Sequence, residues 1–173
     1  MQKADLPAIR FKLEQEVAMT EKKWAYEDLA EGATIPFGPK TVSAEEIITF
    51  ARQFDPQPMH LDEAAGKASL LGGLSASGWH SSAIFMRMLY DALLADSTSQ
   101  GSPGITESRW KRPVLAGDTL SGATTVIARR TLRSRPGIGL VTLRHLVVNQ
   151  RGETVMEIEN PIMFGMRSRG DAA

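Results

Sequence analysis

The stretch Ala83-Ile84-Phe85-Met86-Arg87-Met88-Leu89-Tyr90-Asp91-Ala92-Leu93-Leu94-Ala95 decides how the rest of the chain can fold. Its apolar side chains cover most of the circumference of a helix, and only Arg87 and Asp91, four residues apart, mark a side that faces water. A helix that is apolar nearly all round must be buried on most sides. The pattern therefore predicts a central helix with other elements packed around it.

Strand-like segments follow this helix. Residues 121–130 are rich in Thr, Val and Ile, residues 139–148 are rich in Val and Leu, and Asn149-Gln150-Arg151-Gly152 is typical of a turn. The next segment alternates Thr154, Met156 and Ile158 with glutamates at 153, 157 and 159, and Val155 is the exception. Long strands joined by short turns predict an α+β fold, in which a curved antiparallel sheet wraps a long central helix.

The segments before the central helix are shorter. Residues up to Val42 predict an early strand that Pro36 and Pro39 interrupt. Ser43-Ala44-Glu45-Glu46 is typical of a capping box, so a helix begins there and ends before Asp55-Pro56. A second short helix is expected near Asp62, and an apolar stripe through residues 5–22 predicts an N-terminal helix.

Composition excludes several classes of protein. Twenty basic and 20 acidic side chains give a formal net charge of zero, so we expect no nucleic-acid or membrane partner. The absence of cysteine excludes a disulfide framework, a thiolate metal site and a cysteine nucleophile. With no secretory signal, no membrane span and no clustered metal ligands in the sequence, we expect a soluble cytoplasmic protein without a metal.

The segment Asp55-Pro56-Gln57-Pro58-Met59-His60 is the first candidate for chemistry. Its two prolines restrict the backbone, so the segment is stiff and can present Asp55 and His60 toward one point. A carboxylate beside an imidazole suits general acid–base catalysis, because histidine titrates near neutrality and burial can raise the pKa of the aspartate. The alternative is structural: Asp55 caps the following helix and His60 is a satisfied hydrogen-bonding residue.

The second candidate is Gly72-Gly73-Leu74-Ser75-Ala76-Ser77-Gly78-Trp79-His80, which leads directly into the central helix. The free N–H groups of a helix start can stabilise negative charge on a carbonyl oxygen, and Gly78 allows substrate to approach the backbone closely. The alternative is that these glycines only form a tight turn.

The remaining polar residues are weaker candidates. His80 is expected to be a packed or capping group, and His145 lies within a strand. Four arginines surround a turn, where they either form a solvated hairpin tip or contact the phosphates of a nucleotide-bearing substrate. They are Arg129, Arg130, Arg133 and Arg135.

Three segments resemble one known family. Phe54-Asp55-Pro56-Gln57-Pro58-Met59-His60-Leu61-Asp62 resembles the hydratase motif of MaoC-like (R)-specific enoyl-CoA hydratases, and Ala76-Ser77-Gly78-Trp79-His80 resembles the helix-start motif of MaoC-like dehydratases. Arg109-Trp110-Lys111-Arg112-Pro113-Val114-Leu115-Ala116-Gly117-Asp118-Thr119-Leu120 is similar to that family's strand-entry segment. The resemblance covers roughly residues 24–166.

The resemblance implies a hot-dog fold over a single domain at residues 23–168. Outside it, we expect a helical extension at 1–22 and a disordered tail at 169–173. It implies a homodimer or higher homo-oligomer that acts on an acyl-CoA or acyl-carrier thioester. No separate cofactor is expected, since CoA is part of the substrate.

The resemblance also assigns roles to residues. Asp55 and His60 would activate water, and the Gly78 N–H would polarise the thioester carbonyl. Substrate would be bound by Ser77, Trp79, Gln57 and Pro58. Two positions depart from the family pattern, because Gln57 stands where Asn is usual and Ser77 where His is frequent.

Three functions remain open on the sequence. The first is a lyase, an (R)-specific enoyl-CoA hydratase or 3-hydroxyacyl-CoA dehydratase. The second is a hot-dog thioesterase, although residues 77–90 hold none of the acidic residues that such enzymes commonly place on the central helix. The third is a non-catalytic subunit that binds acyl thioesters, which the Gln57 departure keeps open.

Overall fold

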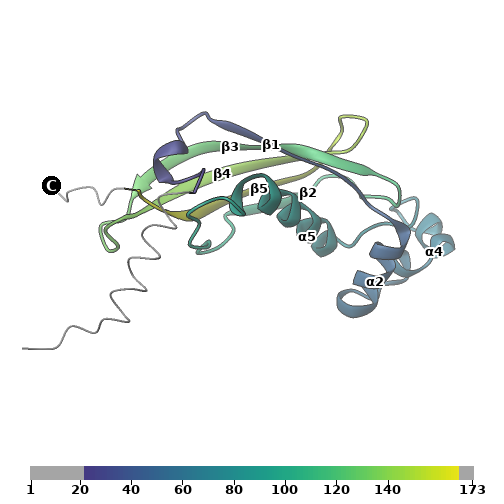
Figure 1. Ribbon diagram of the computed structural model, residues 1–173. Coiled ribbons are helices and arrows are strands. Elements are labelled where there is room, and N and C mark those ends of the chain that lie inside the picture. Colours follow the sequence, from purple (N-terminus) through teal and green to yellow (C-terminus); the bar gives the residue numbers. More distant parts are fainter. Residues whose placement is uncertain (1–21, 168–173) are drawn as a thin grey trace, which may run out of the picture.

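A computed structural model describes residues 22–167 of the chain. Figure 1 shows a long curved sheet with one helix lying across it and shorter helices gathered beyond one end of that helix. The sheet is antiparallel throughout and has the strand order β1-β3-β4-β5-β2. Its strands are β1 (Thr34–Thr41), β2 (Glu107–Trp110), β3 (Thr119–Thr131), β4 (Ile138–Val148) and β5 (Thr154–Gly165).

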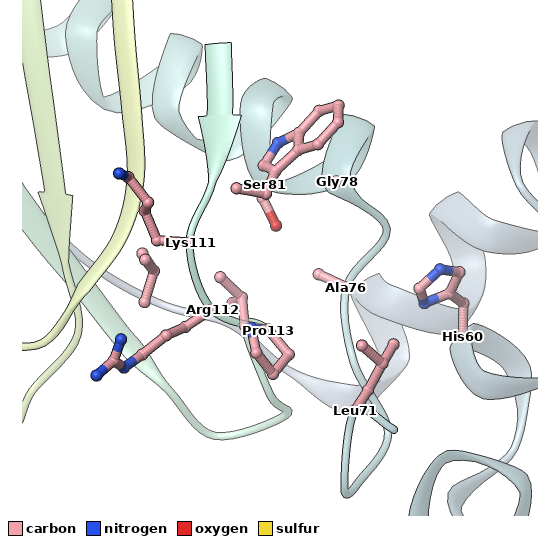
Figure 2. A pocket seen from close by; sticks show the side chains of 11 residues that line it. His60, Leu71, Ala76, Gly78, Ser81, Lys111, Arg112 and Pro113 are labelled. Carbon is pink, nitrogen blue, oxygen red and sulfur yellow. The ribbon is translucent and has the colours of Figure 1, made fainter. Parts of the chain in front are cut away.

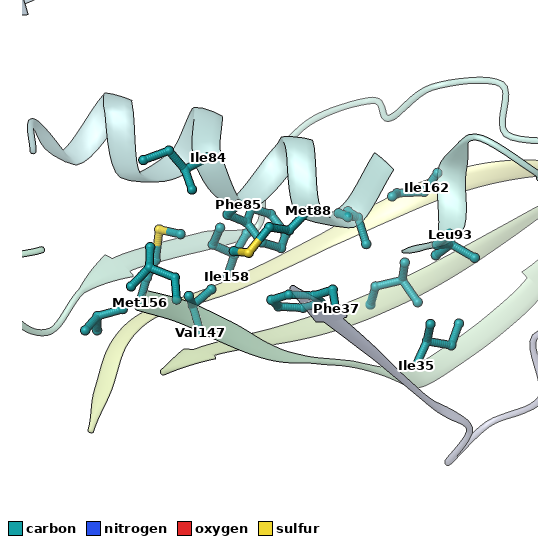
Figure 3. Packing of buried hydrophobic residues seen from close by; sticks show 14 of the residues in the cluster. Ile35, Phe37, Ile84, Phe85, Met88, Leu93, Val147, Met156, Ile158 and Ile162 are labelled. Carbon is teal, nitrogen blue, oxygen red and sulfur yellow. The ribbon is translucent and has the colours of Figure 1, made fainter. Parts of the chain in front are cut away.

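The central helix α5 (Gly78–Leu89) continues into a π-helical turn, η2 (Tyr90–Leu94). Figure 3 shows Ile84, Phe85 and Met88 of α5 pointing toward the sheet. Phe85 meets Phe37 of β1 edge to face, with ring centroids 5.6 Å apart, and both side chains are buried. A long helix held in the concave face of an antiparallel sheet is the hot-dog arrangement, so the predicted α+β hot-dog fold is confirmed.

The outer side of α5 contradicts the prediction that this helix is buried on most sides. Met86 and Tyr90 are 46% and 49% exposed, and Arg87 and Asp91 form an exposed ion pair beside them. The physical reason is that the sheet curls around one side of the helix only. An apolar helix face predicts that other residues pack against it, but it does not show whether those residues belong to the same chain or to another one.

The short elements before α5 follow the sequence signals closely. Helix α2 (Ala44–Phe54) begins with the predicted capping box, in which the Glu46 N–H donates to Ser43 Oγ over 3.1 Å and the Ser43 N–H donates to Glu46 Oε2 over 3.1 Å. It ends at Phe54, as the Asp55-Pro56 pair predicts. Helix α4 (Glu63–Ala68) is the expected second helix.

One turn was not predicted. Helix α3 (Pro58–Leu61) lies within the segment that the sequence analysis described only as stiff, and Pro58 is in its first turn. Proline suits the start of a helix because the N–H that it lacks would have no partner there. The remaining short element is the 3₁₀ turn η1 (Tyr26–Asp28).

The predicted prolines in β1 disturb the strand without ending it. The pairing of β1 with β3 shifts register between Phe37 and Lys40. Gly38 lies in this irregular stretch with a φ of 86°, a conformation that favours glycine.

The predicted domain limits stay predictions. The extension at 1–22, apart from Lys22, and the tail at 169–173 lie outside the described residues. Within residues 22–167, no helix combines the length and apolarity that crossing a bilayer requires.

Candidate active site

Three short segments converge at the first turn of α5. Asp55 directly follows α2, His60 lies in the single turn of α3, and Ser77 is the N-cap residue of α5. The stiffness that two prolines give to the Asp55–His60 segment places both side chains against the same helix start.

Two hydrogen bonds hold the Asp55 carboxylate. Ser77 Oγ donates to Asp55 Oδ2 over 2.6 Å, and Gln57 Nε2 donates to Asp55 Oδ1 over 2.8 Å. The hydrogen bond from Ser77, followed by that from Gln57, lowers the pKa of Asp55, and this outweighs the opposing effect of burial. Burial does act to raise this pKa, as suggested, but the two hydrogen bonds outweigh it, and the carboxylate is ionised at neutral pH.

The His60 ring is buried and oriented by the backbone. Its Nδ1 lies 2.7 Å from the Ser75 carbonyl oxygen, which can only accept, so Nδ1 carries the proton and donates. The other nitrogen, Nε2, lies 3.7 Å from Asp55 Oδ2. This separation is too long for a direct hydrogen bond and leaves room for a water oxygen that bonds both atoms.

The structural alternative for this pair does not hold for Asp55. Its side chain bonds Ser77 and Gln57, while the N-cap residue of α3 is Gln57, which makes no side-chain capping bond. His60 satisfies only one of its nitrogens on the backbone, and the second remains directed toward the carboxylate.

Gly78 is the first residue of α5, and its N–H is one of the donors that a helix start leaves without an intrahelical acceptor. A Cβ atom at this position would lie 2.7 Å from Cε2 of Trp110, closer than packed atoms approach each other. The close approach that requires glycine is therefore made by the indole of Trp110. Ser82 Oγ accepts the indole N–H over 3.3 Å and holds the ring there.

A pocket of about 320 Å³ opens beside these residues. Figure 2 shows His60 on one side of it and Lys111 and Arg112 on the opposite side. Gly78 and Trp110 also line the pocket, together with apolar side chains. Asp55 is not among the lining residues, but its Oδ2 lies next to Nε2 of His60, which is, and to Ser77 Oγ.

The other predicted binding residues lie apart from this wall. Gln57 and Pro58 are exposed, and Trp79 is 66% exposed, with its ring edge-on to Trp110 at a centroid distance of 5.4 Å. The side chains of Ser77 and Gln57 are both bonded to Asp55. Substrate contact by these four residues stays a prediction.

Sequence reasoning missed Trp110, Lys111 and Arg112 as wall residues. They stand in the strand-entry segment that carries the family resemblance, immediately before Pro113. Two adjacent cations at the end of a strand were the available signal.

The remaining histidines are structural. His80 is buried and stacks on Phe50 with ring centroids 4.6 Å apart, and burial lowers its pKa. His145 is buried in β4, where its Nδ1 lies 2.8 Å from Thr124 Oγ1 and its Nε2 lies 2.8 Å from Asn160 Oδ1. Burial lowers the pKa of His145 to about 4.

The arginine cluster spans the end of β3, which holds Arg129 and Arg130, and the turn that leads to β4. Arg133 and Arg135 are exposed there, while Arg129 packs over the Tyr26 ring and donates to the Leu29 carbonyl over 3.2 Å. The pocket is lined by other residues, so the structure favours a hairpin tip over phosphate contacts at the site. In the described part of the chain, no three His, Asp or Glu side chains gather as a metal site would require.

Comparisons with known proteins identify the family and support the fold. A family model described as the MaoC like domain matches residues 29–149. The fold superimposes with a TM-score of 0.75 on a MaoC-like dehydratase from Rhodospirillum rubrum, which is 40% identical, with 83% of this chain and 98% of that chain covered. It superimposes with a TM-score of 0.65 on an R-hydratase from Pseudomonas aeruginosa, which is 25% identical, with 82% and 86% covered.

A sequence relative extends the comparison. The mesaconyl-CoA hydratase of Cereibacter sphaeroides is 39% identical over 70 residues, which are 40% of this chain and 20% of that protein. The family model spans most of the chain and includes all the residues assembled around the pocket except Val155. The chain therefore belongs to the MaoC-like domain family.

Proposed function

We propose that the protein is an (R)-specific enoyl-CoA hydratase, or 3-hydroxyacyl-CoA dehydratase in the reverse direction. The observation that carries this proposal is the 3.7 Å separation of Asp55 Oδ2 and His60 Nε2 beside a pocket that also exposes the start of α5. The similarity to an R-hydratase and to a mesaconyl-CoA hydratase supports it.

Water is activated between the two side chains. It donates one hydrogen bond to His60 Nε2 and one to Asp55 Oδ2, because a carboxylate oxygen accepts and an imidazole whose single proton is on Nδ1 accepts at Nε2. Because hydrogen bonds lower the pKa of Asp55, the carboxylate serves to orient the water, and His60 Nε2 accepts its proton. The Ser75 carbonyl, bonded to Nδ1–H, stabilises the imidazolium that forms.

Hydration of the enoyl thioester then returns the enzyme to its starting protonation state. The water oxygen adds to Cβ of the enoyl thioester, and the electron pair of the C=C bond moves toward the thioester oxygen. The Gly78 N–H at the start of α5 stabilises the resulting enolate. The proton held by His60 passes to Cα, so the elements of one water are added and the enzyme is regenerated. Dehydration follows the same steps in reverse.

The Gln57 departure is compatible with this chemistry, because Gln57 Nε2 donates to Asp55 and keeps the carboxylate ionised and oriented. The helix segment from Ser77 to Tyr90 contains no Asp or Glu, which disfavours the thioesterase alternative.

Turnover of enoyl-CoA tests the proposal. Purified protein is incubated with crotonyl-CoA and with longer and branched trans-2-enoyl-CoAs, and loss of the enoyl absorbance is followed. Products are then offered to an (R)-specific 3-hydroxyacyl-CoA dehydrogenase. We expect hydration to the (R)-alcohol on at least one substrate.

Three other results would each contradict the proposal. The first is folded protein without turnover on the whole panel. The second is release of free CoA from saturated acyl-CoAs, which identifies a thioesterase. The third is calorimetric binding of acyl-CoA without turnover, which identifies a non-catalytic binder.

We also propose that the protein works as a homodimer or higher homo-oligomer. The exposed apolar side of α5, with Trp79, Met86 and Tyr90, and the exposed edge strand β2 are the surfaces that a second copy would cover. Sedimentation analysis checks the prediction, and a monomer at all concentrations would contradict it. The cytoplasmic location stays a prediction.

A further inference from the structure

The side of the pocket opposite His60 is cationic. Lys111 and Arg112 follow directly after β2, and both line the pocket (Figure 2). Their backbone is fixed, because the N–H groups of Lys111 and Arg112 both donate to the Val155 carbonyl, over 2.8 and 3.4 Å. The backbone of both residues is therefore held against β5 at the edge of the pocket.

The neighbouring glutamates do not occupy all the N–H donors of the Lys111 and Arg112 side chains. Arg112 Nε lies 3.7 Å from Glu153 Oε1, beyond hydrogen-bond distance, and Glu153 is already bonded to Arg151 Nε over 2.8 Å. Lys111 Nζ lies 3.0 Å from Glu157 Oε2. A guanidinium has five N–H donors and an ammonium three, so both groups can bind a further anion.

The chemistry of the wall matches an anionic ligand. The Arg112 side chain is 54% exposed, and its planar donor array suits two oxygens of a phosphate or carboxylate. The Lys111 side chain is 36% exposed and adds a point charge next to it. Other lining residues, such as Leu71, Ala76 and Val114, are apolar and suit the uncharged part of a ligand.

We propose that Lys111 and Arg112 form an anion subsite that binds a phosphate or carboxylate group of the thioester substrate. This inference rests on the proposed function, since it places the reacting carbons between His60 and Gly78. The anion is either a phosphate of the CoA or carrier-borne pantetheine arm or a carboxylate at the end of the acyl group. The subsite contributes to binding and takes no part in the proton transfers.

Three thioester substrates distinguish a phosphate from a carboxylate as the anion that the subsite binds. Crotonyl-CoA carries phosphates, crotonyl-N-acetylcysteamine carries no anion, and the N-acetylcysteamine thioester of a trans-2-enedioic acid carries only a carboxylate. Their KM and kcat values are measured for the wild type, for Lys111→Met/Arg112→Gln and for Lys67→Met. The last is a matched control, because Lys67 pairs with Glu63 on α4 away from the pocket.

For a phosphate subsite, the double variant raises the KM for crotonyl-CoA about tenfold, an effect that weakens with added salt, and leaves kinetics with crotonyl-N-acetylcysteamine unchanged. For a carboxylate subsite, the same rise appears only with the enedioic thioester. The Lys67→Met control changes neither KM. An unchanged KM for both anionic substrates in the double variant would overturn the inference.

Failure of the proposed function is distinguishable from failure of the subsite. If the wild type hydrates none of the three thioesters, the hydratase proposal fails. Calorimetry with free CoA and with the enedioic thioester then decides the subsite by itself. Binding of either ligand that the double variant weakens about tenfold supports it, and equal affinities in the two proteins, or no binding, overturn it.

Discussion

Acidification should destabilise the folded protein through the buried imidazole of His145. This ring lies beneath the central helix, with its centroid 4.8 Å from that of Phe85, and it is bonded to Thr124 and Asn160. Burial disfavours the charged form and lowers the pKa from 6.5 to about 4, although the hydrogen bond to Asn160 acts in the opposite direction.

The sign of the effect follows from proton binding. Below pH 6.5 the unfolded chain protonates His145, whereas the folded protein does so only near pH 4, so the unfolded state binds more protons in this interval. The stability contribution is complete above the unfolded pKa and is lost as the pH falls toward the folded one. The loss is about 2 kcal/mol by about pH 5 and about 3 kcal/mol below both values.

Urea unfolding measured at about pH 7.5 and about pH 5 tests this prediction in the wild type and in His145→Gln. Glutamine can retain a donor and an acceptor but does not titrate. We expect the variant to be less stable at pH 7.5 and its loss of stability on acidification to be about 2 kcal/mol smaller than in the wild type. His80 and the carboxylates titrate in both proteins and cancel in the comparison. Equal losses of stability in the two proteins would refute the assignment.

Two predictions concern the residues around the helix start. Ser77→Ala removes the 2.6 Å hydrogen bond to Asp55, which is worth about 1.5–3 kcal/mol for a charged acceptor. We expect this variant to lower kcat roughly 10- to 100-fold and Ser77→Thr to retain activity. Equal kcat values for the Ala and Thr variants would count against this role. Gly78→Ala drives a methyl group into Trp110 and should destabilise the protein by about 1–3 kcal/mol. Adding Trp110→Ala should abolish the incremental cost of Gly78→Ala in thermal unfolding, and a cost that persists there would show that the clash is not its cause.

Local signals in the sequence predicted the local structure well. The Ser43–Glu46 capping box and the Asp55-Pro56 stop define α2 at both ends, since each acts through neighbouring residues. The exposed side of α5 could not be foreseen, because Met86 and Tyr90 look the same in the sequence whether this chain or another one covers them.

The sequence predicted the reactive pair of the site, but it did not predict the residues that surround this pair. The prolines placed Asp55 and His60 near each other, but the low pKa of Asp55 depends on Ser77, which is 22 residues away in the chain. Trp110, Lys111 and Arg112 reach the pocket only because β2 pairs with β5 and brings the end of β2 to the start of α5. Such contacts depend on strand register, which no short motif records.

The central claim is that Asp55 and His60 together activate water, and the most direct test is the rate of crotonyl-CoA hydration by Asp55→Asn and His60→Gln. Asp62→Asn is a matched control, because Asp62 caps α4 by accepting the Ala65 N–H over 2.8 Å and asparagine caps equally well. Circular dichroism and unfolding midpoints establish that each variant is folded. We predict that each site variant loses about two to four orders of magnitude in kcat/KM while the control retains its activity. Folded Asp55→Asn and His60→Gln proteins that both keep nearly full activity would contradict the claim.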